Sequence, residues 1–279
     1  MLNKSYINLI TGDIHEDFKK FSNPLYKMMK LKNWNNIRLF VAGDFGLDFH
    51  GGQTEKDIVF KKKVQNLGIE VFSVIGNHEN RDVLDQFPVV YRNGGKMDQA
   101  GDKLFYLING EIYTFTDENG IPFNLFAFGG GFSTDRKERI EHEKKTGNCI
   151  FGEKEMPSDS EYEYARGKLN ASQNKIDIII SHTSPLEIKK HIIKYFRVPG
   201  KDIYGGEHKL NLFLEEILSS VSYKKWFFGH FHCDAIMTPD EKIYAVFEDI
   251  RFLTTGEVTN TNNILKKVKA IQKTKNRKA

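Results

Sequence analysis

The stretch YINLITGDIH at residues 6–15 joins a strand-like apolar run to residue types that bind metal ions. Residues 6–11 are mostly apolar and β-branched, which is typical of a buried strand, and Asp13 and His15 follow directly. Four later runs have the same form, at residues 37–42, 70–75, 176–181 and 224–228. The sequence therefore predicts five buried strands that each end beside potential metal ligands.

The spacing of the first three runs predicts a parallel sheet. Asp13, Asp44 and Asn77 follow these runs at intervals of 31 and 33 residues, and helical patterns lie between them at roughly 23–33 and 54–66. Such an interval is the length of a strand–helix–strand unit, whose strands are parallel. Open α/β sheets bind ligands in a crevice at the carboxyl ends of their strands. We therefore expect the polar residues after the strands to share one site.

The second half of the chain favours shorter strands. Residues 112–116 and 124–128 flank the turn sequence Asp-Glu-Asn-Gly, which predicts an antiparallel hairpin in a second sheet or at the edge of a mixed one. The charged segment 129–160 is expected to be a surface insertion or lid with a helix near 136–144. Further expectations are helices at 161–170 and 209–220, a loop at 183–207 and a hairpin at 236–253.

Composition and charge divide the chain into one domain and a tail. The 279 residues are 39% hydrophobic, which is enough for a large core and excludes a disordered or fibrous chain. The net charge is +4, but seven bases lie in an acid-free C-terminal stretch: Lys266, Lys267, Lys269, Lys273, Lys275, Arg277 and Lys278. Without them the remaining chain carries −3, so no nucleic-acid-binding face is predicted. We expect a domain over residues 1–255 and a flexible basic tail over 256–279.

Cysteine usage and hydropathy favour a cytoplasmic protein without a membrane partner. Cys149 and Cys233 are not spaced as in a zinc or redox motif. No segment approaches the ~20 apolar residues that span a bilayer. The tail could bind nucleic acid through counterion release, but it has no interleaved aromatic residues, so a solvated tail is the better explanation. The sequence indicates no particular oligomeric state.

The residues at the strand ends suit a pair of metal ions. Carboxylate, amide and imidazole groups bind manganese, iron, nickel or zinc, whereas copper(I) and iron–sulfur sites need thiolates. Seven donors exceed the needs of one tetrahedral ion but suffice for two if one carboxylate bridges them. These donors are Asp13, His15, Asp44, Asn77, His182, His230 and His232.

The order of these motifs resembles the calcineurin-like metallophosphoesterase superfamily, whose pattern runs D-x-H, G-D, G-N-H-E/D, H, G-H-x-H. The resemblance covers roughly residues 5–250, and segments such as 43–46 and 76–80 are most similar to a bacterial and phage branch. It implies a four-layer α/β/β/α sandwich, in which two mixed β-sheets are flanked by helices. It also implies a two-metal phosphoester hydrolase that attacks a monoester or diester with a metal-bridging hydroxide.

The resemblance assigns roles to individual residues. One ion would be held by Asp13, His15 and His232, and the other by Asn77, His182 and His230. Asp44 would bridge the two ions, and Asn77 would also contact the substrate. His78 corresponds to the histidine that faces the leaving group and would act as general acid. Manganese is the favoured ion, and iron, zinc and nickel fit the same donors.

The sequence departs from the phosphoprotein phosphatases, in which the bridging Asp is followed by x-x-Asp-Arg-Gly. Here Asp48 comes one residue late and the arginine is missing. Asp48 is nevertheless a candidate to orient His78. Arg81 and Arg136 are candidates for binding phosphate, because a guanidinium group binds phosphate oxygens bidentately.

Two alternatives remain open from the sequence. The first is a nuclease or nucleotide phosphodiesterase, with the basic tail contributing to binding. The second is a catalytically silent interaction scaffold, because a fold does not fix a function. The complete set of donors favours an enzyme, since a scaffold has no need of it.

Overall fold

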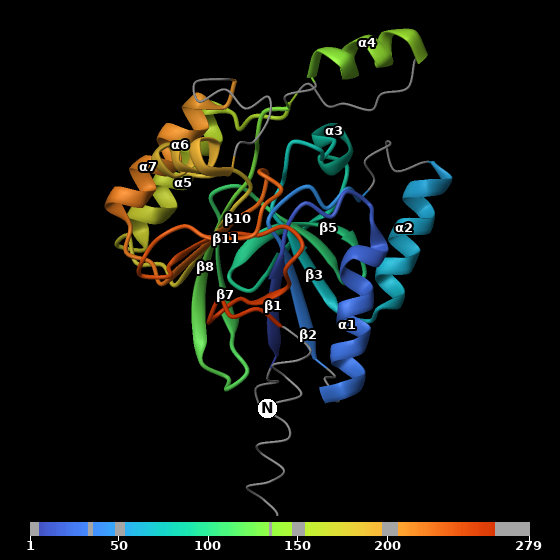
Figure 1. Cartoon of the computed structure of the whole chain (residues 1–279), viewed down its shortest axis with the longest axis horizontal. Helices are drawn as coiled ribbons and strands as arrows, with labels where there is room; N and C mark the ends of the chain where they lie inside the picture. The colour runs from blue at the N-terminus through green and yellow to red at the C-terminus, as the bar shows by residue number, and fades with distance from the viewer. Residues whose placement is uncertain are drawn as a thin grey trace, which may run out of the picture.

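Two mixed β-sheets pack face to face and carry helices on their outer sides (Figure 1). The computed structural model describes residues 6–32, 36–47, 54–133, 136–146, 154–196 and 206–259. The expected four-layer α/β/β/α fold class is confirmed.

The first sheet has four parallel strands at its centre, β1 (Ile7–Thr11), β2 (Ile37–Val41), β3 (Glu70–Ser73) and β6 (Leu104–Leu107). Its antiparallel edge strands are β13 (Arg251–Phe252) beside β1, and β5 (Gly95–Gly101) and β4 (Val89–Arg92) beyond β6. Helices α1 (Phe18–Lys32) and α2 (Glu55–Asn66) connect the first three strands. The predicted strand–helix–strand units are therefore present.

The second sheet has the order β11 (Ala235–Ile236), β12 (Ile243–Ala245), β10 (Lys225–Phe228), β9 (Ile178–Ser181), β8 (Pro122–Phe128) and β7 (Ile112–Thr116). Neighbouring strands from β12 to β8 are parallel, and the two outer strands are antiparallel. The predicted β7–β8 hairpin is confirmed. The predicted hairpin at 236–253 is correct only for β11 and β12, because β13 crosses to the first sheet and pairs with β1.

Alternating side chains fill three apolar layers. In β1, Leu9 packs with the layer of α1 and α2, whereas Ile10 packs between the sheets. Between the sheets, the Phe72 ring lies 5.3 Å from Phe40 and 5.1 Å from Phe115, measured between centroids. Helices α5 (Asp159–Ala171), α6 (Leu186–Phe196) and α7 (His208–Ser220) cover the outer face of the second sheet. This packing fixes the strand ends of both sheets relative to one another.

Three local expectations differ from the structure. Helix α1 begins five residues early, because the Asp17 carboxylate accepts the backbone N–H groups of Lys19 and Lys20 and caps its first turn. The segment 183–207, expected to be a loop, contains α6. The segment 129–160 carries α4 (Arg136–Thr146) as expected, but residues 129–131 at its start are buried.

A short helix, α3 (Arg81–Leu84), follows β3. In the described ranges no helix has both the length and the apolar composition needed to cross a bilayer. Residues 260–279, which include the seven tail bases, lie outside the described part of the chain.

Candidate metal centre

The carboxyl ends of the parallel strands of both sheets meet at one place, and the predicted donors gather there. The first sheet contributes residues after β1, β2 and β3, and the second sheet contributes residues after β9 and β10. Three groups each bring one ligand atom per residue within 4.8 Å of one another: Asp13, His15 and His232; His15, Asp44 and His78; Asp13, Asp44 and His182.

Unusual backbone conformations turn these side chains off the strand ends. Asp13, His15, Asp44, His230 and His232 all have φ between 46° and 67°. L-residues rarely adopt this left-handed region, which costs roughly 1–2 kcal/mol per residue. Five of the proposed ligands adopt this unfavourable backbone conformation. We infer that the packing of the site, and not the intrinsic backbone preference of these residues, determines the conformation of the loops.

Two glycines beside the donors are required by close approach. At Gly43, where φ is +85°, an added Cβ would overlap the His182 ring. At Gly76, an added Cβ would overlap the Asp44 carboxylate. Each glycine therefore makes room for a donor that comes from a different strand end.

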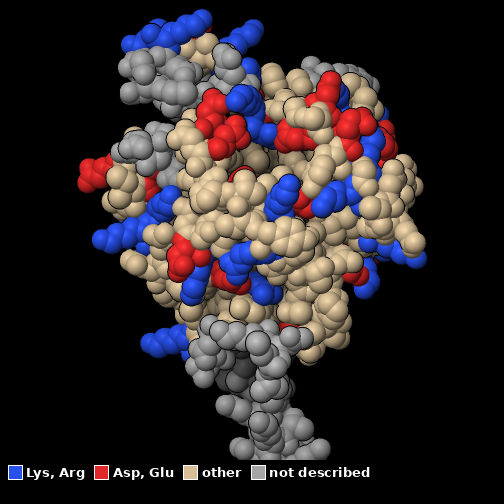
Figure 2. Space-filling view, turned by 180° about the vertical axis from the view of Figure 1, so that it is seen from behind, with Lys and Arg blue, Asp and Glu red and all other residues tan. Residues whose placement is uncertain are grey.

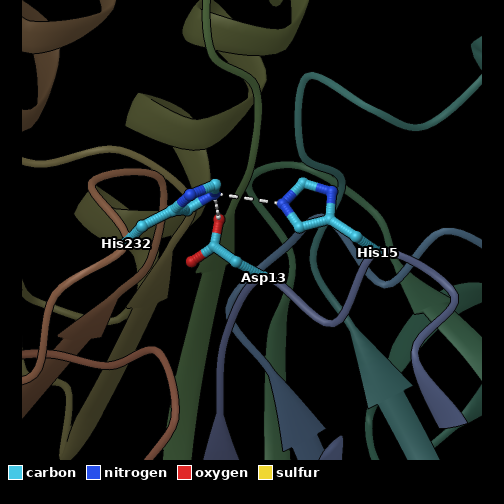
Figure 3. A group of neighbouring side chains, drawn as sticks. All are labelled: Asp13, His15 and His232. Carbon is cyan, nitrogen blue, oxygen red and sulfur yellow. Dashed lines mark hydrogen bonds and ion pairs between the residues drawn. The ribbon is translucent and has the colours of Figure 1, made fainter. Parts of the chain in front are cut away.

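Asp13, His15 and His232 form the first group of donors, and their side chains face one another (Figure 3). His15 Nε2 and His232 Nε2 are 3.0 Å apart, and His232 Nε2 is 3.7 Å from Asp13 Oδ1. Both Asp13 oxygens accept the backbone N–H of His230 at 2.9 Å. A solvent-open pocket of about 560 Å³, with Lys20 and Phe247 among its walls, adjoins this group. A substrate can therefore reach these donors directly from solvent.

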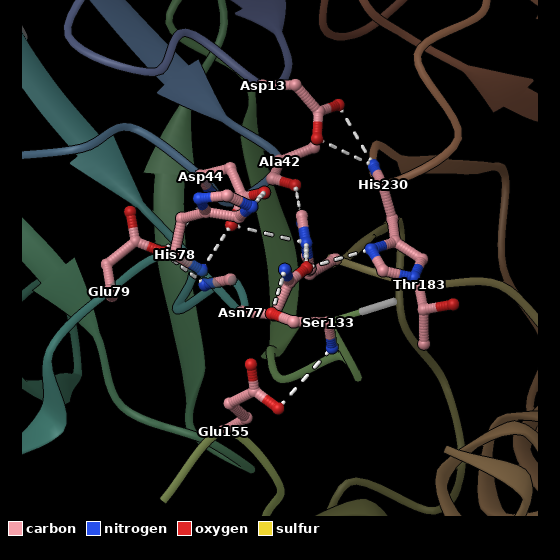
Figure 4. Close-up of polar contacts among 12 residues, drawn as sticks. Asp13, Ala42, Asp44, Asn77, His78, Glu79, Ser133, Glu155, Thr183 and His230 are labelled. Atoms are coloured by element: carbon pink, nitrogen blue, oxygen red, sulfur yellow. Dashed lines mark hydrogen bonds and ion pairs between the residues drawn. The ribbon is translucent and has the colours of Figure 1, made fainter. Parts of the chain in front are cut away.

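A further set of donors, Asn77, His182 and His230, is buried, and its members converge on one another (Figure 4). His182 Nδ1 lies 2.8 Å from the Ala42 carbonyl oxygen, so Nδ1 carries a proton and the neutral ring has its lone pair on Nε2. Asn77 Nδ2 donates to Ser133 Oγ at 2.9 Å, which turns Asn77 Oδ1 inward. His182 Nε2 is 2.8 Å from Asn77 Oδ1, and His230 Nδ1 is 2.9 Å from the same oxygen.

This arrangement fits a divalent cation. His230 Nε2 is 3.1 Å from Glu207 Oε2, so Nε2 carries the proton and Nδ1 has the lone pair. Two bare imidazole nitrogens thus face one amide oxygen, and Asp44 Oδ1 is 3.4 Å from His182 Nε2. Unprotonated acceptors this close repel one another, and a cation among them removes that repulsion. Imidazole, amide and carboxylate are the ligands that borderline and hard divalent ions prefer.

Asp44 lies between the two groups. Its Oδ2 is 3.7 Å from His15 Nε2 and 3.9 Å from His78 Nε2, and its Oδ1 accepts the backbone N–H of His78 at 2.8 Å. Behind it, the buried Glu79 carboxylate accepts the N–H groups of residues 44, 45, 46 and 76. Burial, and secondarily the charge of Asp44, raises the pKa of Glu79 to about 8. Through these hydrogen bonds, Glu79 holds together the loop that carries Asp44 and the loop that carries Asn77.

The candidate phosphate-binding arginines are engaged with carboxylates. Arg81 Nη1 donates to Glu161 Oε1 at 2.8 Å, and Arg136 Nη1 donates to Glu155 Oε2 at 2.8 Å. Asp48 lies outside the described residues.

Four carboxylates and hydroxyls near the site were not singled out from the sequence: Glu79, Ser133, Glu155 and Glu207. Ser133 and the buried Glu155 come from the segment 129–160 and support the amide of Asn77. Glu79 belongs to the G-N-H-E motif, so the motif itself was a signal for it. The other three have no such signal, because their partners lie far away in the sequence.

Comparisons with known proteins give one family match and a set of distant structural neighbours. The model of the calcineurin-like phosphoesterase family matches residues 9–234. No curated protein matches the chain. Among solved structures, the phosphopantetheinyl hydrolase of Mycobacterium tuberculosis is 13% identical, with 88% of this chain and 91% of that chain covered and a TM-score of 0.43. A dimetal phosphatase from Danio rerio is 12% identical, with 86% of each chain covered and a TM-score of 0.43.

Proposed function

Because the chain belongs to the calcineurin-like phosphoesterase family, we propose that it hydrolyses phosphoric monoesters or diesters where its two sheets end. Membership of this family makes the chain a metallophosphoesterase, and the family binds two divalent metal ions. The ligand assignment that we propose is the one implied by the motifs. Asp13, His15 and His232 hold one ion, Asn77, His182 and His230 hold the other, and Asp44 is shared.

One observation carries this proposal. The lone pairs of His182 Nε2 and His230 Nδ1 both point to Asn77 Oδ1, at 2.8 and 2.9 Å. Hydrogen bonds to Ala42 and Glu207 occupy the opposite ring nitrogens, so in the neutral imidazoles both facing nitrogens are acceptors. A cation bound by all three groups satisfies these acceptors together. We propose manganese, with iron, zinc and nickel as alternatives that the same donors accept.

The residues around the ions have distinct tasks in the proposed reaction. The chemistry that two bound divalent ions supply is activation of water as the nucleophile and neutralisation of charge on the phosphoryl oxygens. Asp44 aligns the site, because its carboxylate reaches the imidazoles of His15, His78 and His182 within 3.4–3.9 Å. His78 is partly exposed and can donate a proton from Nε2 to the departing alkoxide. Imidazole suits this task because it titrates near neutral pH.

The substrate contacts remain part of the proposal. We retain Asn77 as a candidate contact to a phosphoryl oxygen. Arg81 and Arg136 would have to exchange their carboxylate partners, Glu161 and Glu155, for a phosphate group. We retain Asp48 as the residue that orients His78. Nucleic acid is not the favoured substrate, and any contribution of the basic tail is tested by removing residues 264–279.

The proposed function is tested with metal-free protein. Each of Mn²⁺, Fe²⁺, Zn²⁺ and Ni²⁺ is added back, and hydrolysis of p-nitrophenyl phosphate and bis-p-nitrophenyl phosphate is followed. We expect no turnover without metal and turnover of at least one ester with two ions bound per chain, fastest with Mn²⁺. A protein that binds two ions and hydrolyses neither these esters nor any nucleotide diester would instead support the silent scaffold. A full-length chain that cleaves nucleic acid faster than the truncated chain, in a salt-dependent way, would support the nuclease.

A further inference from the structure

A buried carboxylate lies directly behind His230. Glu207 is 3% exposed, and its Oε2 is 3.1 Å from His230 Nε2. His230 turns its other ring nitrogen, Nδ1, to Asn77 Oδ1 at 2.9 Å (Figure 4). The imidazole thus connects Glu207 to the group of lone pairs in which we place an ion.

Glu207 is itself held on several sides. Its Oε1 is 2.9 Å from the ammonium of Lys189 and accepts from Thr183 Oγ1 at 3.3 Å. Its Oε2 also accepts the backbone N–H of Phe132 at 3.2 Å. Lys189 in turn donates to Asn211 Oδ1 at 3.1 Å. Rotation of the Glu207 carboxylate would break several of these bonds together, so its position relative to His230 is fixed.

Two features indicate that this network contributes little to the stability of the fold. The Lys189 and Glu207 side chains are 2% and 3% exposed, and the desolvation of such a buried ion pair commonly cancels its attraction. In addition, Glu207 occupies the N-cap position of α7, yet its side chain makes no capping hydrogen bond. A side-chain cap stabilises a helix by about 1 kcal/mol. The Glu207 side chain therefore does not cap the helix and contacts His230 instead.

We propose that Glu207, held by Lys189, is a positioning residue that sets the tautomer of His230 toward the second metal ion. An ionised carboxylate only accepts hydrogen bonds, so the facing Nε2 must carry the proton and Nδ1 keeps its lone pair. Carboxylates behind metal-binding histidines orient the ring in this way and raise its basicity. The inference rests on the proposed function, because it takes His230 to be a metal ligand. His182 obtains the opposite tautomer from the Ala42 carbonyl.

The tautomer is measured in the metal-free protein, independently of activity. Long-range ¹⁵N–¹H spectra distinguish protonated from unprotonated ring nitrogens, and His230→Gln identifies the signals of His230. In the wild type we expect a proton on Nε2 and none on Nδ1. The double variant Lys189→Met/Glu207→Leu removes both charges and leaves no unpaired ion, and we expect it to show a mixture of tautomers.

Metal affinity is measured by titration calorimetry on the same variants. We expect the double variant to bind one of two ions roughly 10- to 100-fold more weakly and the other with unchanged affinity. Glu111→Gln is the matched control, because Glu111 is a buried carboxylate paired with Lys168 away from the site. It should leave both affinities and the His230 tautomer unchanged. If the double variant does not fold, Glu207→Gln decides by the same readouts, with about tenfold weaker binding of one ion expected.

The possible results separate the two hypotheses. A folded double variant that keeps the Nε2–H tautomer and both affinities would overturn the role of Glu207. A wild-type chain that binds no ion would overturn the proposed function. In that case the tautomer in the metal-free variants would still decide whether Glu207 sets the state of His230.

Discussion

Replacement of Asp44 by Asn tests the charge of the central carboxylate while keeping its shape. Asn tolerates the left-handed backbone that Asp44 adopts, where φ is 52°. Its amide oxygen can still accept the backbone N–H of His78, which lies at 2.8 Å. The change therefore removes a negative charge that lies 3.4–3.9 Å from three imidazole nitrogens and little else.

The metal-free protein should not be destabilised by this change. Burial and the charge of Asp44 together raise the pKa of Glu79 to about 8. Loss of the Asp44 charge lowers that pKa and relieves repulsion between the two carboxylates. The substitution should therefore leave the metal-free protein unchanged in stability or make it more stable. We expect the free energy of unfolding of the metal-free variant to be within about 1 kcal/mol of the wild-type value or above it.

The metal-loaded protein should lose stability. An ion at 100 times its Kd adds about 2.7 kcal/mol to the free energy of unfolding. Loss of a residue that only supports a metal ligand weakens metal binding by roughly 10- to 100-fold. Loss of the charge of a ligand itself should weaken metal binding at least as much. By the same formula, each ion at the same concentration would then add only roughly 0.4–1.4 kcal/mol to the free energy of unfolding. At about 2–4 °C per kcal/mol for a chain of this size, the metal-induced rise in Tm should shrink by about 3–9 °C per ion.

The assay compares thermal melts with and without metal and measures turnover at saturating metal. A loss of several kcal/mol of transition-state stabilisation lowers kcat by roughly 100- to 1,000-fold. Asp177→Asn is the control, because Asp177 binds Lys224 and the Asn124 backbone N–H away from the site, and it should keep the full metal-induced rise in Tm. An Asp44→Asn protein with undiminished metal stabilisation and full turnover would refute the reasoning.

Three further predictions concern a proton donor, a hydroxyl and a buried acid. His78→Gln should lower kcat by roughly 100- to 10,000-fold for alkyl esters and much less for p-nitrophenyl esters; equal losses on both would count against a general acid. Ser133→Ala removes the acceptor for Asn77 Nδ2, and calorimetry should show about tenfold weaker binding of one ion. Burial, with a smaller contribution from Asp85, raises the pKa of Asp98 from 3.8 to about 6, so the folded state binds more protons and loses stability as the pH rises through this interval. Asp98→Asn should therefore add about 1–3 kcal/mol to the free energy of unfolding above pH 7 and nothing below pH 3.8, as urea denaturation at both values can check.

The sequence predicted the elements whose signals are local. Each strand that leads to the site is a short apolar run followed at once by a polar motif, so both its existence and its end were visible. Helix α6 also had a signal, since Pro185 precedes an apolar pattern that includes Leu186 and Ile192. The expectation of a loop there was therefore wrong. By contrast, no local pattern predicts that β13 leaves its hairpin to pair with β1.

The residues behind the donors were harder to predict for a physical reason. Ser133 meets Asn77 across 56 positions of sequence, and Glu207 meets Phe132 across 75. A buried glutamate and a surface glutamate are the same letter in the sequence, and only tertiary packing distinguishes them. Metal motifs are visible because the ligands directly follow the strands, whereas Ser133, Glu155 and Glu207 lie in loops and turns outside these motifs.

The costs of the fold are concentrated where the donors meet. Five of the proposed ligands have left-handed backbones, at roughly 1–2 kcal/mol each. Glu79 and Asp44 place two carboxylates together, and two imidazole lone pairs face one amide oxygen. A divalent cation offsets the repulsion between the carboxylates and the repulsion between the facing acceptors. It does not relieve the backbone strain, which the apolar packing between the sheets must offset. Since metal binding relieves this electrostatic repulsion, the same arrangement that destabilises the metal-free chain favours the binding of metal ions.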